Sequence, residues 1–111
     1  MVSGLFLKEG CLIASGSVVG NVAWGGEPEP NSTMSWNSFV RAFDPDSLRE
    51  GTGYPVRGRA ARSTVMSAST VGGVLTVGII SGEMSIGRER VGVKGRHVLL
   101  VTVLPPPQCL P

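Results

Sequence analysis

The stretch from Val71 to Leu104 constrains the fold more than any other part of this 111-residue chain. β-Branched residues crowd it, and glycine-containing turn signals interrupt it at short intervals. That combination is typical of short strands joined by tight turns. We therefore expect a mainly β fold, a small barrel or sandwich of six to seven short antiparallel strands with one short helix.

Two hairpins are predicted inside this stretch. A turn at Ser81-Gly82 would pair Ile79 with Met84 and leave one hairpin face wholly apolar. A second turn, at Gly95-Arg96, would pair the strands on either side of it. The run from Val98 to Leu104 is apolar on both faces, which is typical of a central strand. A charge in the middle of this run is therefore expected to prevent folding.

The N-terminal half contains a further hairpin, a strand and a helix signal. Leu5 to Ala14 is predicted to form the hairpin, around a three-residue turn at Lys8-Glu9-Gly10, and Val18 to Trp24 a strand. Trp36 to Phe43 has helical spacing of its large apolar residues and stays ambiguous. Asp44 to Glu50 gives the clearest helix signal, with a capping aspartate, a proline at the first helical position and a glycine directly after it.

Length and composition indicate one domain over residues 1–111, with a loop at 25–37 and a proline-rich tail at 105–111. Sixteen glycines favour turns and strands, and the low aromatic content of 5% leaves aliphatic side chains to build the core. Three basic and six acidic residues precede Gly51, whereas seven basic and two acidic residues come after it. This polarity would allow copies of the chain to pair head to tail.

The two cysteines, Cys11 and Cys109, lie near the two ends of the chain. A single long-range disulfide is one option, but two cysteines do not make a disulfide framework, and two unpaired thiols are the favoured interpretation. No signal peptide is evident, and the longest apolar run, Val71 to Ile80, is too short for a membrane span. We expect a soluble protein, intracellular or associated with a particle, in an otherwise undetermined compartment.

The sequence contains no recognisable catalytic, metal or cofactor-binding constellation. His97 is the only histidine and has no partner in its neighbourhood, and Cys11 has no adjacent base. Asp44 and Asp46 are explained by a capping role at a helix start rather than by metal binding. We therefore expect a protein that is not an enzyme and that needs no metal or cofactor.

One group of basic residues is a candidate contact for phosphate or nucleic acid. Arginine dominates the group, and arginine suits bidentate contacts with phosphate. The chain has no aromatic residue after Tyr54, so it lacks the stacking platforms that single-strand binders usually add. The candidate residues are Arg57, Arg59, Arg62, Arg88, Arg90, Lys94 and Arg96.

The hypothesis that these observations favour is a non-enzymatic structural or interaction subunit of a larger assembly, with a virion or another multi-subunit particle as one setting. It would form a homo-oligomer or a larger protein assembly, with the apolar tail docked on a neighbouring subunit. A small nucleic-acid-binding β-barrel with an arginine-rich surface is the first alternative. A poorly folded product of a young reading frame is the second.

Overall fold

The computed structural model describes residues 2–19, 23–24, 27–28, 36–57, 62–86 and 89–109. These residues form strands and turns and no helix, so the mainly β prediction is confirmed. The strands exceed the six or seven expected. They are β1 (Val2–Lys8), β2 (Cys11–Val19), β3 (Ala23–Trp24), β4 (Glu27–Pro28), β5 (Trp36–Phe43), β6 (Glu50–Arg57), β7 (Arg62–Thr70), β8 (Gly73–Ser81), β9 (Met84–Ile86), β10 (Glu89–Val91) and β11 (His97–Leu104).

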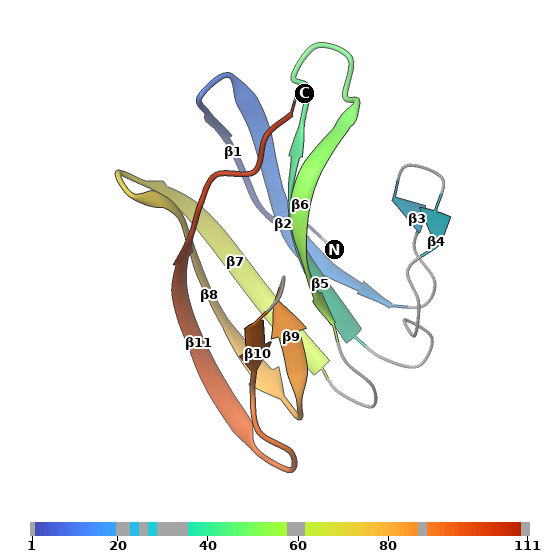
Figure 1. Cartoon of the computed structure of the whole chain (residues 1–111), viewed down its shortest axis with the longest axis vertical. Helices are drawn as coiled ribbons and strands as arrows, with labels where there is room; N and C mark the ends of the chain where they lie inside the picture. The colour runs from blue at the N-terminus through green and yellow to red at the C-terminus, as the bar shows by residue number, and fades with distance from the viewer. Residues whose placement is uncertain are drawn as a thin grey trace.

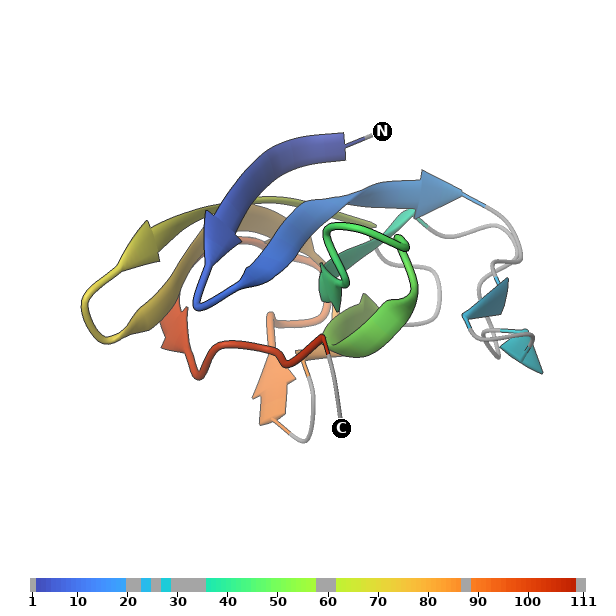
Figure 2. The same cartoon turned by 90° about the horizontal axis from the view of Figure 1, so that it is seen from above.

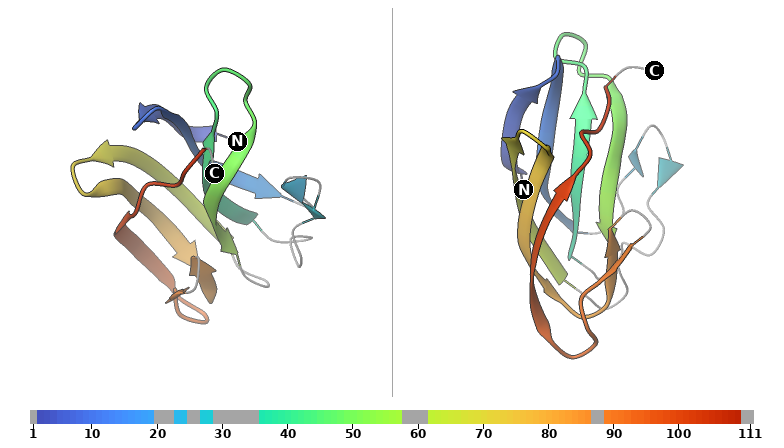
Figure 3. Two further views of the ribbon diagram at one scale, coloured as in Figure 1. Left: turned by 45° about the horizontal axis from the view of Figure 1, so that its top comes forward. Right: turned by 60° about the vertical axis from the view of Figure 1, so that its left-hand side comes forward.

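The strands form two antiparallel groups that a single parallel pair, Trp36 with Arg62, joins into one sheet. One group has the order β1-β2-β5-β6-β9-β10, and the other has the order β7-β8-β11. β7 also packs against β1 and β2, so the two groups face each other there. Figures 1 and 3 show β11 at the outer margin of the second group. The strand pairing branches at β5 and ends at β1, β10 and β11, so the sheet is not closed into a barrel, and the β3–β4 pair forms a small sheet of its own.

The N-terminal hairpin is confirmed, with a tighter turn than the sequence indicated. Lys8 pairs with Cys11, and only Glu9 and Gly10 lie between the strands. Both turn residues have positive φ, 52° and 79°, as the favoured two-residue hairpin turn requires. Of the predicted strand from Val18 to Trp24, the start belongs to β2 and the end forms β3, while residues 20–22 lie outside the described part.

The predicted helix from Asp44 to Glu50 is wrong, although the capping chemistry behind it is present. The Asp44 carboxylate accepts hydrogen bonds from the backbone N–H groups of Asp46 and Ser47, both at 2.9 Å. A helix would then continue, but Leu48 turns to a φ of 60°, and the Asp44 N–H donates to the Arg49 carbonyl at 2.9 Å. The segment is therefore a turn between β5 and β6, and the ambiguous stretch before it is a strand.

Both hairpins predicted for the C-terminal stretch are wrong. β8 pairs on one side with β7 and on the other with β11, so it is the central strand of its group. After Ser81 the chain leaves that group, and β9 pairs with β6 and β10. A turn exists at Lys94 and Gly95, one residue earlier than predicted, closed by a 3.1 Å hydrogen bond from Arg96 N to Val93 O. Local patterns marked the strands correctly and could not identify their partners.

The core consists of two small aliphatic clusters, as the low aromatic content predicts. One cluster is centred on Ile13, Val40 and Val74, which are fully buried. The other contains Ile80, Met84 and Ile86, and Tyr54 and Leu104 pack against both clusters. Between the groups, Ser38 Oγ lies 2.7 Å from Ser63 Oγ, so small polar side chains form part of the buried contact.

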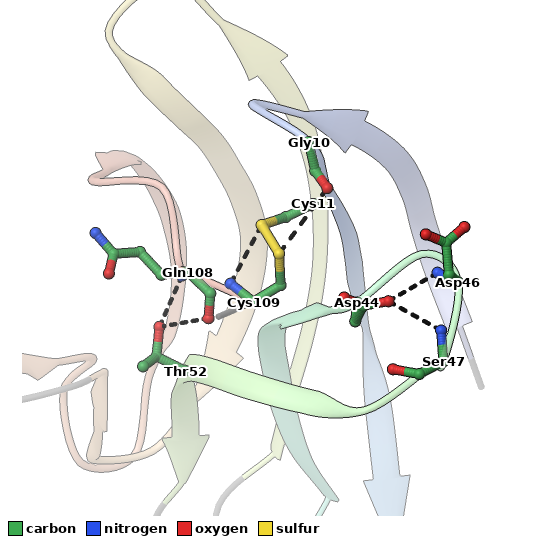
Figure 4. The surroundings of a disulfide bond; sticks show 8 residues. All are labelled: Gly10, Cys11, Asp44, Asp46, Ser47, Thr52, Gln108 and Cys109. Atoms are coloured by element: carbon green, nitrogen blue, oxygen red, sulfur yellow. Dashed lines mark hydrogen bonds between the residues drawn. A yellow bond between two sulfur atoms is a disulfide. The ribbon is translucent and has the colours of Figure 1, made fainter. Parts of the chain in front are cut away.

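The two cysteines form a disulfide, so the expectation of unpaired thiols is wrong. Cys11 starts β2, and Cys109 lies 98 positions later with a Cα–Cα distance of 5.6 Å (Figure 4). Both residues are buried in the first core cluster, where a thiol or a disulfide sulfur acts as a small apolar group. The sequence alone could not reveal this pairing, because it depends on where the tail returns.

The C-terminal tail packs on its own chain and not, as expected, on a neighbour. Figures 1 and 2 show it leaving β11 and running to β6. Thr52 N donates to the Gln108 carbonyl and Gln108 N donates to Thr52 Oγ1, both at 2.8 Å, and the Tyr54 hydroxyl donates to the Pro105 carbonyl at 2.9 Å. Gly51 permits this approach, since a Cβ there would overlap the Gln108 carbonyl. Residues 110–111 lie outside the described part.

Candidate interaction surface and basic pocket

The outer face of β7, β8 and β11 carries an ordered array of apolar side chains. Residues across the three strands are in direct register and share one face, because alternate residues of a strand point to the same side. Three successive rows are apolar or nearly so, and we call them together the outer face. The rows are Thr64–Ile79–Leu99, Met66–Val77–Val101 and Ala68–Leu75–Val103.

Five large side chains of the outer face are open to solvent, whereas Leu75 and Val77 are half-buried. The exposed fractions are 71% for Leu99, 62% for Val101, 59% for Ile79, 56% for Met66 and 50% for Val103. Side chains of this size exposed to this degree present roughly 500 Å² of apolar surface, near the upper limit for one patch on a monomer. Isolated apolar residues are normal on surfaces, but a contiguous array of this size is typical of a contact surface.

β11 borders the outer face and is an edge strand rather than the predicted central one. Among the described residues it pairs only with β8, over eight consecutive positions without a bulge. It contains no lysine, arginine, aspartate, glutamate or proline, which are the residues that normally prevent an edge from pairing with another chain. Its second face, which carries Leu100 and Leu104, packs on the core. This explains why the strand is apolar on both faces without being central.

The other two ends of the main sheet, β1 and β10, are protected. β1 has a register shift between Val2 and Gly4, and its last residue, Lys8, donates to the Thr70 carbonyl at 2.8 Å. β10 is three residues long and exposes Glu89 and Arg90. Short length, bulges and charges all discourage edge-to-edge pairing. Among these three ends of the main sheet, β11 is the one without such protection.

A groove of about 520 Å³ lies beside β11 on its inner side. Its walls come from β6, β9, β10 and β11. Most of its lining is apolar, and Glu89 contributes the one charged side chain among the described lining residues. Such a groove can accept alternate side chains of a strand that adds to the β11 edge. The lining residues are Tyr54, Ile86, Glu89, Val91, Leu100, Val101, Thr102, Val103, Leu104 and Pro105.

The structure brings two of the predicted basic residues together. Arg62 and Arg96 line one pocket of about 360 Å³ with Ser81, Gly82, Gly95 and His97, and we call it the Arg62–Arg96 pocket. Arg90 and Lys94 are exposed and do not line it. Arg57 lies at the end of β6, and nothing is described of its side chain. Arg59 and Arg88 lie outside the described residues.

Ser81 and His97 form a polar pair within this pocket. They are cross-strand neighbours, and Ser81 Oγ lies 2.5 Å from His97 Nδ1. Where such a pair supports nucleophilic catalysis, a third group usually orients the histidine and donors receive the oxyanion. In the part of the chain that the structure describes, the hydrogen bond recorded for the His97 ring is the one with Ser81.

Two further ionisable groups, Asp44 and Tyr54, have pKa values shifted by their surroundings. Backbone N–H donors, first that of Ser47 and then that of Asp46, lower the pKa of Asp44. Burial raises the pKa of Tyr54, whose hydroxyl holds the tail. Within the described ranges, no three histidine, cysteine, aspartate or glutamate side chains gather in a way that would hold a metal ion. The same residues include no apolar helix of membrane-spanning length.

No known protein family matches this chain, and no curated protein or solved structure shows significant similarity to it. The functional conclusions therefore depend on the geometry alone. Sequence reasoning identified Arg62 and Arg96 but missed the outer face, because that face exists only when β8 pairs with β7 and β11. The available signal for this face was an uncharged strand followed by three prolines, but this pattern fits a strand at the edge of a sheet as well as a central strand.

Proposed function

We propose that this protein is a non-enzymatic interaction subunit, a two-layered β-sandwich that associates with a second copy of itself through β11. The observation that carries the proposal is the combination at this strand of an unprotected edge and an exposed apolar face. Monomers rarely keep both, since each favours association with another chain. The function is therefore assigned to a contact surface and not to a catalytic centre.

A second copy of the chain fits the β11 edge better than an unrelated strand does, because the β11 strands of two copies can pair with each other. Antiparallel pairing about a twofold axis near Val101 would place each strand against its counterpart and use the whole length of β11. Leu99 of one copy would then lie opposite Val103 of the other on the outer face, so apolar side chains meet apolar ones. Inner-face leucines of the second strand would be directed towards the groove beside β11.

A standard interface buries about 800 Å² of each partner. Pairing by edges buries the β11 backbone, the β11 side chains and the rim of the groove, whereas most of the outer face, roughly 500 Å², stays exposed beside the new strand pair. Pairing by edges would also join two outer faces into one larger apolar face, on which further copies could stack. This accounts for a subunit of a larger assembly, with a virion or other particle as one setting.

The disulfide indicates the kind of compartment in which such an assembly would function. Disulfides persist mainly in secreted proteins, on surfaces and in other oxidising settings, and they are rare where glutathione keeps thiols reduced. The buried bond between Cys11 and Cys109 therefore favours an oxidising compartment or a particle exposed to one. That location replaces the intracellular one as our proposal.

The test introduces one lysine at two exposed valines and compares the mass in solution. Val101→Lys places like charges opposite each other across the twofold axis, whereas Val71→Lys makes the same change at a fully exposed turn residue off the outer face. We expect wild type and Val71→Lys to sediment as species larger than a monomer at about 100 μM, and Val101→Lys to sediment as a monomer. Both variants should keep the wild-type circular dichroism.

A charge-swap experiment tests the register. An equimolar mixture of Val101→Lys and Val101→Asp should recover the dimer that neither variant forms alone, because opposite charges would then meet at the axis. A wild-type protein that stays monomeric, or a Val101→Lys variant that associates as well as Val71→Lys does, would contradict the proposal. If the mixture of Val101→Lys and Val101→Asp forms no dimer, pairing about Val101 is excluded.

A further inference from the structure

The geometry points to a binding site for a compact phosphate dianion, such as a phosphate monoester, in the Arg62–Arg96 pocket. This inference does not rest on self-association. The pocket lies where the outer face ends, because Arg62, Ser81 and His97 form the next cross-strand row after Thr64–Ile79–Leu99. Arg62 and His97 thus flank Ser81 on neighbouring strands about 5 Å away on either side.

The backbone holds the pocket in place. Arg96 N donates to Val93 O at 3.1 Å, and the Arg96 carbonyl accepts from Gly82 N at 3.1 Å. These bonds tie the turn before β11 to the chain that leaves β8. Gly95 occupies a φ of 75° in this turn, and an added side chain would meet no atom there, so the surroundings are open to an incoming group. A site whose backbone is fixed in advance loses less entropy when it binds.

Charge supplies the attraction. Neither the Arg62 nor the Arg96 guanidinium has an ion pair or a hydrogen bond to another described residue. Two like charges at one pocket repel each other, and an anion between them removes that repulsion. Guanidinium groups bind phosphate oxygens through two parallel N–H donors, which makes arginine well suited to this ligand.

The Ser81–His97 pair adds directional donors. When the Ser81 hydroxyl donates to His97 Nδ1, the neutral imidazole carries its proton on Nε2, and that N–H is available to a ligand oxygen. Two arginines and one histidine thus line one volume of about 360 Å³. A small tetrahedral dianion fits this number of donors.

The same geometry argues against an extended nucleic acid strand as the ligand. Binding along a phosphodiester backbone needs a track of cations, usually interleaved with aromatic platforms. Neither Arg90 nor Lys94 lines the pocket, so the described basic residues do not form a continuous track through it. The chain has no aromatic residue after Tyr54. One localised phosphate group is therefore the better match.

The experiment titrates inorganic phosphate into ¹⁵N-labelled protein at constant ionic strength and monitors the amides of Gly82, Gly95 and Arg96. We expect saturable shifts at these amides with a dissociation constant of about 1 mM, and none with chloride. Arg62→Gln and Arg96→Gln should each weaken binding about tenfold or more. Arg90→Gln makes the same charge change outside the pocket and should bind as wild type does.

Two further measurements make the result decisive. Arg96→Lys keeps the charge but loses the planar fork, so it should bind more weakly than wild type and more tightly than Arg96→Gln. Shifts that do not saturate by about 50 mM, or equal weakening by Arg90→Gln and Arg96→Gln, would overturn the inference. Separate titrations with a nucleoside 5′-monophosphate and with phosphatidic acid vesicles show whether a soluble phosphate or a lipid headgroup is the better source of the group.

Discussion

Removing the disulfide should cost this protein a large share of its stability. The change is Cys11→Ala together with Cys109→Ala, compared with the oxidised wild type. The bond closes a loop with a sequence separation of 98. For a loop of about 100 residues, the chain-entropy description gives a loss of about 4.7 kcal/mol when the cross-link is removed. A domain of this size has about 5–15 kcal/mol of total stability, so the variant should be marginal.

The measurement is urea unfolding monitored by circular dichroism, with a thermal scan alongside. We expect the free energy of unfolding to fall by about 4–5 kcal/mol and the melting temperature to fall by roughly 20 °C. Wild type in reducing agent provides a second route to the same state. A loss below about 1 kcal/mol would refute the loop-closure reasoning. A wild type that melts without cooperativity would instead favour a poorly folded chain.

Hydrogen exchange in the folded variant shows whether the disulfide or the hydrogen bonds of the tail hold the tail in place. Its tail keeps the hydrogen bonds of Thr52 with Gln108 and of Tyr54 with Pro105. The Thr52 amide should therefore stay protected from hydrogen exchange while the protein remains folded. Fast exchange at Thr52 in a folded variant would show that the disulfide, and not these bonds, holds the tail in place.

Three other substitutions test the packing. Gly78→Ala should destabilise by about 1–3 kcal/mol, because its methyl would overlap the Thr64 carbonyl and lie 2.9 Å from Val65 Cγ1. In the same melts Gly95→Ala should cost less, about 1 kcal/mol from its φ of 75° alone. Thr76→Val should raise the unfolding free energy by about 1 kcal/mol, since the buried Thr76 hydroxyl has no partner among the described residues. The pKa of Asp44 is lowered in the folded state. The ionised carboxylate therefore contributes to folding stability above the unfolded pKa of 3.8, and this stability is lost as the pH falls through the folded pKa. Asp44→Asn should accordingly flatten the fall in melting temperature between about pH 5 and pH 3.

The sequence predicted the features that depend on local chemistry. Strand composition predicted a mainly β chain, and the Lys8-Glu9-Gly10 turn predicted its first hairpin. The Asp44 signal was real as a cap and wrong as a helix, because a cap fixes only the first turn. The path of the backbone beyond that turn depends on Leu48 and on the partner strand, which no local rule contains.

The sequence could not predict contacts between distant segments. Val98 to Leu104 has the same apolar pattern whether β11 is central or at an edge, so its exposure depends on which strands pair with β8. The pattern suggested that a charge at Val101 would prevent folding, whereas its 62% exposure predicts that folding survives and association fails. Similarly, Arg62 and Arg96 are 34 positions apart in the sequence and share a pocket only because both lie beside Ser81.

The covalent bond between Cys11 and Cys109 also determines how the molecule carries tension. A pulling force that enters before Cys11 and leaves after Cys109 passes through the sulfur atoms and bypasses every strand from β2 to β11. Only β1 and its turn lie outside this shortcut. Because Val2–Lys8 is already an extended strand that runs away from Cys11, freeing it with its turn lengthens the molecule by only about 10 Å. Oxidised, the protein should behave under load as a short, stiff link, and after reduction the strands from β2 to β11 become extensible.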